Sequence, residues 1–374
     1  MFAAMSTITG RLSQIILPEA VAHLLRDDDD DDESSDGSSS SDEDQSDTDD
    51  HDEANGSFDP RIADVLIVKL LLNRITVPLG DQEMALPIEV INMILDHAEY
   101  WPHSTTNVHY NNLQVRAGHP NGDNKFLIRC RPLGFLENDF PSPESAGGAD
   151  PITSPLRKAF DPDVFQDYIA KRWNFPAVLA NPCRRIVFTI VSHDQGWGGD
   201  PYSRGTYRAS WTWFEVGLER FDAGSGKKEE HKEQGEAKDR MGSPTTKEET
   251  EPEVQQRVFT KEKLRTVLPE VMGDGETLHH PLHPVEELMI QRNVTADHDH
   301  REHHVVWSYD DGIDAGSPVA QEALGAKGRG LGTGNGQFVR DLKLGDVVTV
   351  WAKARFPQWV NYVEEVKVDI YWAI

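Results

Sequence analysis

The clearest pattern along the chain is a series of short apolar runs separated by glycine-rich turns in the C-terminal half. We expect strands in six of these runs, at residues 185–191, 208–218, 305–309, 337–340, 346–354 and 363–372. In residues 346–354 both alternating sets of positions are largely apolar, which favours a strand buried on both faces. Short strands rich in aromatic residues predict a mainly β fold, a jelly-roll-like β-sandwich.

The N-terminal half has a mixed pattern. Residues 12–25 place apolar groups at helical spacing, and a second helix is expected from Leu86 to Trp101, where Pro102 ends it. The apolar run 63–72 fits a helix or a strand equally well by periodicity alone. Further elements are expected in three places: strands at 108–117 and 125–130, and a short amphipathic helix at 165–173.

These elements define five regions along the chain, separated by changes in composition. We expect a short amphipathic helix in residues 1–26, a disordered acidic tract in 27–59, a small mixed helix and strand region in 60–135, a linker in 136–163 and the β-sandwich domain in 164–374. The sandwich is predicted to contain a disordered insert at 222–256, because that stretch is charged, repetitive and almost free of aliphatic side chains.

Charge modifies this picture at one place. The net charge is −27, and residues 27–53 contain sixteen aspartates or glutamates with no lysine or arginine. Such a tail repels phosphate backbones, so we expect no nucleic acid partner. Ser39, Ser40, Ser41 and Ser46 each precede an acidic residue by three positions and are candidates for acid-directed phosphorylation.

Cysteine content and hydropathy point to the reducing interior of the cell. The two cysteines, Cys130 and Cys183, are too few for a disulfide framework. No apolar run approaches the roughly 18 residues that a membrane span requires, so we expect no membrane association. The predicted location is the cytoplasm or the nucleus.

Several segments together resemble a family of uncharacterised proteins that are frequent in fungal genomes. They are SHDQGWGGD (192–200), SWTWFEV (210–216), VVWSYDD (305–311), residues 338–364 and VDIYWAI (368–374), preceded by an LPxEVxxxILDxAEYW element at 86–101. The resemblance covers about two thirds of the chain. It implies no particular activity, because that family has none assigned.

A second, looser likeness suggests a role in ubiquitin transfer. The apolar and proline positions of 86–95 are similar to the first helix of an F-box, and the SxDxGWGG and SWTWFE strands are similar in style to galactose-binding-like sandwiches of some F-box proteins. The likeness implies a substrate adaptor of a ubiquitin ligase. It departs from the F-box pattern after Pro102, where the further apolar helices are missing.

The glycine-rich loop after the first strong strand is the main candidate binding site. Ser192, His193 and Asp194 are consecutive there, but adjacent residues of a strand point to opposite faces, so they do not predict a catalytic triad. Aromatic faces combined with donors and acceptors suit a sugar ring or a peptide side chain. The candidate ligand-binding residues are Asp194, Gln195, Trp197, Tyr202 and Arg204.

Histidines cluster farther along the chain, in the segment HDHREHH. His298, His300 and His304 are weak candidates for metal ligands, since zinc prefers imidazole but neither strand nor helix spacing supplies a complete tetrahedral set. The sequence predicts no cofactor. A metal-dependent enzyme that uses this segment is kept as a second alternative function.

The function we expect from the sequence is therefore non-catalytic recognition. The protein is predicted to be a binding or adaptor protein, not an enzyme, whose sandwich-edge loops contact a protein partner or a carbohydrate. Leu86, Ile91 and Trp359 are the candidate partner-binding residues. The F-box-type substrate adaptor is the first alternative.

Overall fold

The computed structural model describes residues 60–79, 82–118, 123–135, 151, 153–173, 179, 181–224, 259–273 and 277–374. The predictions for 1–26, for the acidic tract with Ser39, Ser40, Ser41 and Ser46, and for most of the linker and the insert lie outside these residues. The chain divides into two compact units, with the boundary between Pro102 and His103. Each unit is described by itself.

The first unit contains two helices and a hairpin. Helix α3 (Ile62–Leu72) is followed by strands β1 (Thr76–Leu79) and β2 (Gln82–Ala85), which pair antiparallel, and by helix α4 (Ile88–His97). The run that periodicity left undecided is therefore a helix. Asp64, at its third helical position, accepts a 2.9 Å hydrogen bond from the backbone N–H of Arg61 and so satisfies one of the free donors of the first turn.

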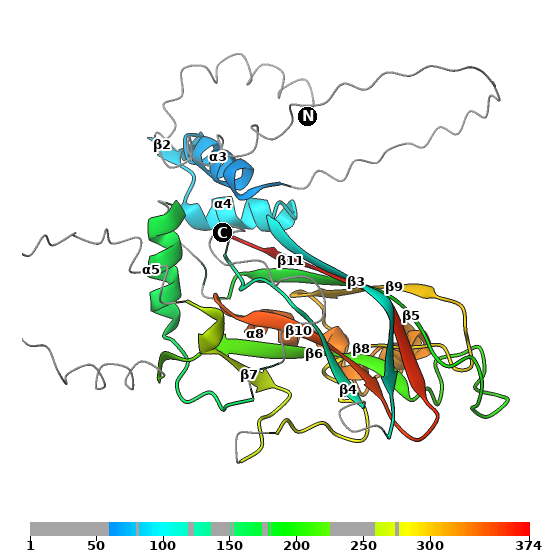
Figure 1. Cartoon of the computed structure of the whole chain (residues 1–374). Helices are drawn as coiled ribbons and strands as arrows, with labels where there is room; N and C mark the ends of the chain where they lie inside the picture. The colour runs from blue at the N-terminus through cyan, green and yellow to red at the C-terminus, as the bar shows by residue number, and fades with distance from the viewer. Residues whose placement is uncertain are drawn as a thin grey trace, which may run out of the picture. The chain divides into compact units, whose positions relative to one another are not determined.

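The second unit is built from two antiparallel sheets (Figure 1). The first sheet has the order β3 (His103–Arg116), β11 (Val360–Trp372), β5 (Cys183–His193) and β9 (Arg301–Ser308). The second has the order β4 (Asn124–Arg129), β10 (Val347–Ala354), β6 (Thr212–Phe221) and β7 (Leu264–Leu268), and β8 (Met289–Arg292) also pairs with β6. The predicted β-sandwich is confirmed.

The strand order identifies the sandwich as a jelly roll. We set β7 aside as an added edge strand and number the other eight strands of this unit from one to eight in chain order, so that β3 is the first and β11 the eighth. One sheet then has the order first, eighth, third and sixth (β3, β11, β5, β9), and the other has the order second, seventh, fourth and fifth (β4, β10, β6, β8). Two Greek keys folded over each other give this interleaved order. One consequence is that the loops that follow alternate strands converge at the same end of the sandwich.

Two predictions about the elements are corrected. Residues 337–340 were expected to form a strand, but Gln337–Asp341 is helix α8, because Asn335 Oδ1 accepts the backbone N–H of Gln337 and the Gln337 side chain bonds Asp341 one turn later. The strands expected at 108–117 and 125–130 exist as β3 and β4. They belong to the two sheets of the sandwich and not to a separate N-terminal region, because β3 pairs with β11 and β4 pairs with β10.

Short helical elements connect the strands of the second unit. They are α5 (Pro162–Trp173), η3 (Lys261–Lys263), α7 (Pro318–Ala323), η4 (Gly325–Lys327), η5 (Leu331–Asn335) and α8. None of the helices in the described ranges is long and apolar enough to cross a membrane.

Strand β10 lies at the centre of its sheet, and all eight of its residues are buried, as predicted for a strand covered on both faces. Val350 and Ala352, with Phe214 and Val216 of β6, form an aliphatic and aromatic face that belongs to the sandwich core. The opposite face of the same strands carries tryptophans and charged side chains. This second face is also buried, a feature that becomes important below.

Candidate functional site

Four loops meet at one end of the sandwich, and we call this end the rim. The loops connect β3 to β4, β5 to β6, β8 to β9 and β10 to β11. In Figure 1 the β5–β6, β8–β9 and β10–β11 loops lie toward the right. Backbone bonds tie them together: Ala117 N–H donates to Trp359 O (3.2 Å) and Gly205 N–H to Thr295 O (2.9 Å). The rim is therefore one continuous surface formed by segments far apart in sequence.

Asp194 is fully buried and holds two of these loops together. Its Oδ1 accepts the backbone N–H groups of Gly196 (2.8 Å) and Asp297 (3.0 Å), and its Oδ2 accepts that of Ala296 (2.7 Å). Burial raises the pKa of Asp194 to about 6, against the opposing effect of these three hydrogen bonds. Asp194 is thus a structural anchor of the rim and is not exposed to a ligand.

Gln195 and Arg204, two other predicted ligand-binding residues, are also engaged within the rim. Gln195 Nε2 donates to Trp197 O (2.7 Å) and its Oε1 accepts the backbone N–H of Val360 (3.1 Å), which joins the β5–β6 and β10–β11 loops. Arg204 Nε donates to Gly198 O (3.0 Å), although the side chain remains exposed. Asp194 and Gln195 therefore hold the loop in shape, whereas Arg204 bonds within the rim through its Nε alone and exposes the rest of its guanidinium group.

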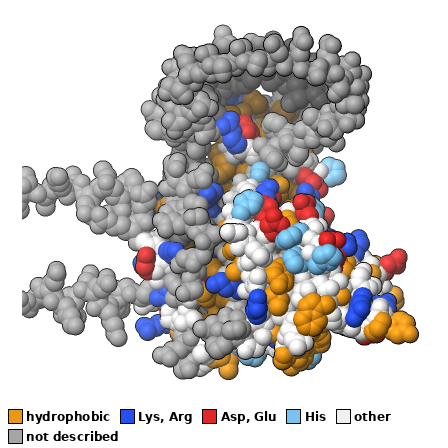
Figure 2. Space-filling model, turned by 45° about the vertical axis from the view of Figure 1, so that its right-hand side comes forward, with side chains coloured by type: hydrophobic (Ala, Val, Ile, Leu, Met, Phe, Trp, Pro, Cys, Tyr) orange, Lys and Arg blue, Asp and Glu red, His pale blue; other side chains and the backbone are white. Residues whose placement is uncertain are grey.

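The aromatic members of the predicted site face solvent. Trp197 is 54% exposed and Tyr202 is 90% exposed. Phe356, on the β10–β11 loop, is 42% exposed and packs edge-on against Trp211 at 4.5 Å between ring centroids. Figure 2, which turns the right-hand side of Figure 1 forward, shows hydrophobic side chains on the surface among histidines and acidic residues. In the same FPQWVN segment the sequence singles out Trp359 and not Phe356.

The histidines are partly assembled at the rim. His193 stacks on Tyr362 and meets His300 edge-on, with 4.5 Å between ring centroids in each pair. His304 lies farther along β9 and is not part of this group. Within the described residues, the group that could hold a metal ion is Asp297, His298 and Asp299, and two of its three members are exposed. The predicted trio of His298, His300 and His304 is not brought together as a ligand set.

Ser192 has a structural role beneath the rim. Its hydroxyl donates to Asn293 Oδ1 (2.7 Å), and Asn293 Nδ2 donates to Asn361 Oδ1 (2.9 Å). All three residues are fully buried. This chain of hydrogen bonds links β5, β11 and the β8–β9 loop, and it leaves Ser192 without a bond to His193.

The predicted partner-binding residues are placed differently from one another. Ile91 is fully buried on the inner side of α4, whereas Leu86 is half-buried just before this helix. The exposed apolar side chains of α4 are Val90, Met93 and Ile94. Trp359 is half-buried in the β10–β11 loop and is therefore a member of the rim.

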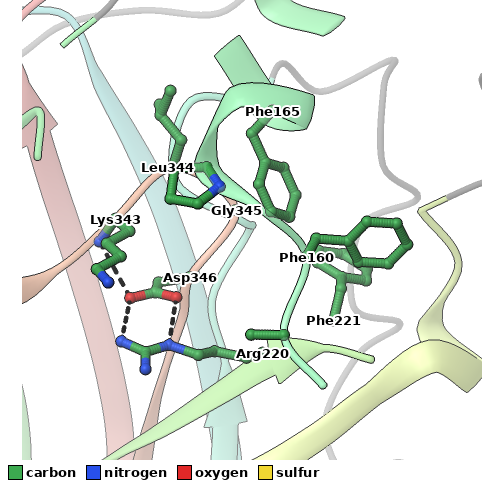
Figure 3. Close-up of a pocket in the computed structure, with 10 residues that line it drawn as sticks. Phe160, Phe165, Arg220, Phe221, Lys343, Leu344, Gly345 and Asp346 are labelled. Atoms are coloured by element: carbon green, nitrogen blue, oxygen red, sulfur yellow. Dashed lines mark hydrogen bonds and ion pairs between the residues drawn. The ribbon is translucent and has the colours of Figure 1, made fainter. Parts of the chain in front are cut away.

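A small cavity of about 60 Å³ lies away from the rim, at the other end of β6 and beside α5 (Figure 3). Phe160, Phe165 and Phe221 form one wall, and Arg220 forms a bidentate pair with Asp346 on the other, at 2.8 and 3.0 Å. This volume accommodates a few water molecules at most. The aromatic rings pack α5 onto the sheet, and Phe165 and Phe259 stack with 4.7 Å between their ring centroids. We therefore regard this cavity as part of the packing between α5 and the sheet and not as a binding site.

Comparisons with known proteins give no guide to this geometry: no protein-family model matches the chain, and neither the curated proteins nor the solved structures contain a match. The resemblance to a fungal family and the F-box likeness therefore stay predictions.

Proposed function

We propose that this protein is a non-catalytic binding protein whose rim docks a protein partner. The observation that carries the proposal is the exposure of Trp197 and Tyr202 on a loop fixed by internal hydrogen bonds. Tryptophan and tyrosine are the residues most enriched among the energetic hot spots of protein interfaces. A fixed loop also loses little conformational entropy when it binds.

The hydrogen-bonding state of the rim favours a protein over a carbohydrate. A sugar needs several free donors and acceptors around the aromatic platform. Here the carboxylate of Asp194 and both ends of the Gln195 amide are already bonded within the rim. What remains is the aromatic faces of Trp197 and Tyr202 and the exposed guanidinium group of Arg204, the three residue types enriched in the hot spots of protein interfaces.

Backbone conformation gives independent support for a functional rim. Phe356 and Gln358, in the β10–β11 loop, have φ values of 65° and 78°, a left-handed conformation that non-glycine residues rarely adopt. Strain of this kind costs about 1–3 kcal/mol per residue and is concentrated at functional sites. This left-handed conformation of the loop accompanies the exposed position of the Phe356 side chain beside Trp211.

The test is a pair of alanine substitutions, Trp197→Ala and Tyr202→Ala. A photo-reactive amino acid in place of Tyr202 is first used in cells to identify the captured protein. Each alanine variant should then bind that protein at least about tenfold more weakly, since hot-spot truncations exceed about 2 kcal/mol. Val319→Ala, at an exposed site in α7, is the matched control. Equal affinity of all three variants would reject the proposal, and binding of purified glycans that depends on Trp197 would replace it.

The F-box-type adaptor is kept as a second candidate because of the exposed face of α4. Met93 is 69% exposed, and Val90 and Ile94 flank it on the same helix. If the chain is such an adaptor, the wild-type chain should retain the ubiquitin-ligase scaffold in a pull-down and the Met93→Asp variant should not. Failure of the wild-type chain to retain the scaffold dismisses this candidate without affecting the rim.

A further inference from the structure

A second cavity, of about 270 Å³, lies against the face of the β6–β10 pair that is turned away from the sandwich core. We call it the β7–β8 cavity, because the segment that connects these two strands covers it. In the ladder Trp351 pairs with Glu215 and Lys353 pairs with Trp213, so these side chains share one face of the sheet. The cavity is lined by Glu215, Val216, Leu268, Pro269, Glu270, His279, Pro281, Val285, Leu288, Trp351 and Lys353.

The polar floor of this cavity is a buried ion pair. Lys353 Nζ lies 2.7 Å from Glu215 Oε2, and both side chains are at most 5% exposed. Glu215 Oε1 accepts hydrogen bonds from Trp213 Nε1 (2.7 Å) and from the backbone N–H of Val285 (3.1 Å). Both carboxylate oxygens therefore have partners, supplied by the sheet and by the covering segment.

Lys353 is not fully engaged. Its second hydrogen bond goes to His280 Nδ1 at 3.0 Å. Burial, together with the charges of Lys353 and Arg355, lowers the pKa of His280 to about 3, so this ring is neutral and its Nδ1 accepts a hydrogen bond from the ammonium group. An ammonium group has three donors. In the part of the chain that the structure describes, the third donor of Lys353 has no acceptor, and Lys353 lines the cavity.

From these observations we infer that the β7–β8 cavity binds a small neutral molecule with an apolar body and one hydrogen-bond acceptor, such as a carbonyl oxygen, which accepts the free N–H of Lys353. The walls supplied by Leu268, Val285 and Leu288 hold the apolar body. An apolar cavity of about 150 Å³ is sufficient for benzene, so this volume accommodates a ring with a substituent.

Charge restricts the ligand to neutral molecules. A carboxylate on the ligand would meet Glu215, which already neutralises Lys353, and the exposed Glu270 at the solvent side of the cavity. A cationic ligand would place another positive charge beside Lys353 and the neighbouring Arg355, where the buried carboxylate of Glu215 is already paired. Both arrangements bring like charges together in a poorly solvated site, which is unfavourable.

Four single-ring probes of similar size test the inference by ligand-detected NMR titration of the full chain. They are acetophenone (a neutral acceptor), toluene (no acceptor), benzoate (an anion) and benzylamine (a cation). Acetophenone should bind at least about tenfold more tightly than toluene, because a hydrogen bond to a charged donor is worth a factor of this size or more. Benzoate and benzylamine should bind more weakly than acetophenone.

Two variants assign the binding to this cavity. Val285→Phe fills the apolar wall and should abolish binding of every probe, whereas Val319→Phe, at an exposed position of α7, should not. The double variant Lys353→Met/Glu215→Gln removes both charges together and leaves only the neutral amide donor of the new glutamine at the cavity floor, so it should reduce the preference for acetophenone over toluene to about threefold. Absence of binding by acetophenone to the folded wild-type chain, or an undiminished preference in the double variant, would overturn the inference. Neither result bears on the rim, which these variants leave unchanged.

Discussion

Replacing Lys353 alone with methionine should lower the free energy of unfolding by about 3–5 kcal/mol, because the change leaves the buried carboxylate of Glu215 without its counter-ion. Methionine fills a similar volume, so the loss is electrostatic and not a loss of packing. Chemical denaturation at pH 7 provides the measurement.

The matched control for this prediction is the double variant Lys353→Met/Glu215→Gln. Removing both charges of a buried pair is often close to neutral, so this variant should be more stable than Lys353→Met alone. The glutamine introduced in place of Glu215 retains an oxygen to accept the bonds of Trp213 and Val285. If the single and double variants were equally unstable, the pair would matter for its packing and the electrostatic explanation would be wrong.

The sandwich could be predicted from sequence because its signal is local. The runs at 185–191, 346–354 and 363–372 alternate or are apolar throughout, and the structure contains strands β5, β10 and β11 there. Assigning β3 and β4 to the sandwich required knowledge of long-range pairing, since β3 pairs with a strand at the other end of the chain. Composition cannot indicate such a pairing, and for that reason the predicted domain boundary fell in the wrong place.

The same limit applies to the candidate sites. The β5–β6 loop was found from its sequence because Trp197 and Tyr202 stand in a glycine-rich turn, which is a local signal. That Asp194 and Gln195 bond to the β8–β9 and β10–β11 loops could not be foreseen, because their partners are distant in sequence. Glu215 and Lys353 meet only through the register of β6 on β10. In sequence each is a charged residue in a largely apolar strand, and nothing in the pattern relates the two.

A buried charge also makes the rim sensitive to pH. The pKa of Asp194 is raised to about 6 in the folded protein, against about 3.9 for an unfolded aspartate. Between these values the folded chain holds a proton that the unfolded chain has lost, so the contribution of Asp194 to stability falls as the pH rises from about 4 to about 6. A difference of this size corresponds to about 3 kcal/mol across that range.

Asp194→Asn should remove this dependence. The asparagine does not titrate. It places an N–H₂ group or a single oxygen against the amides of Gly196, Ala296 and Asp297, which should lower the free energy of unfolding by about 1–3 kcal/mol at every pH. In urea denaturation at pH 4, 5, 6 and 7, the stability of the wild-type chain relative to the variant should therefore decrease with rising pH and level off above about pH 6.

Asp297→Asn supplies the control with the opposite sign. Burial raises the pKa of Asp297, but its bonds to the Arg301 side chain and the Asp299 amide outweigh that effect, and the net pKa is lowered. Its contribution to stability is therefore present above about pH 4 and lost in acid, the reverse of Asp194. If the three amide hydrogen bonds lowered the pKa of Asp194 by more than burial raises it, the stability difference between the wild-type chain and Asp194→Asn would change with pH in the same direction as the difference for Asp297→Asn. Opposite slopes for the two variants, which lie in the same hydrogen-bonded cluster of the rim, would show that desolvation of Asp194 dominates there.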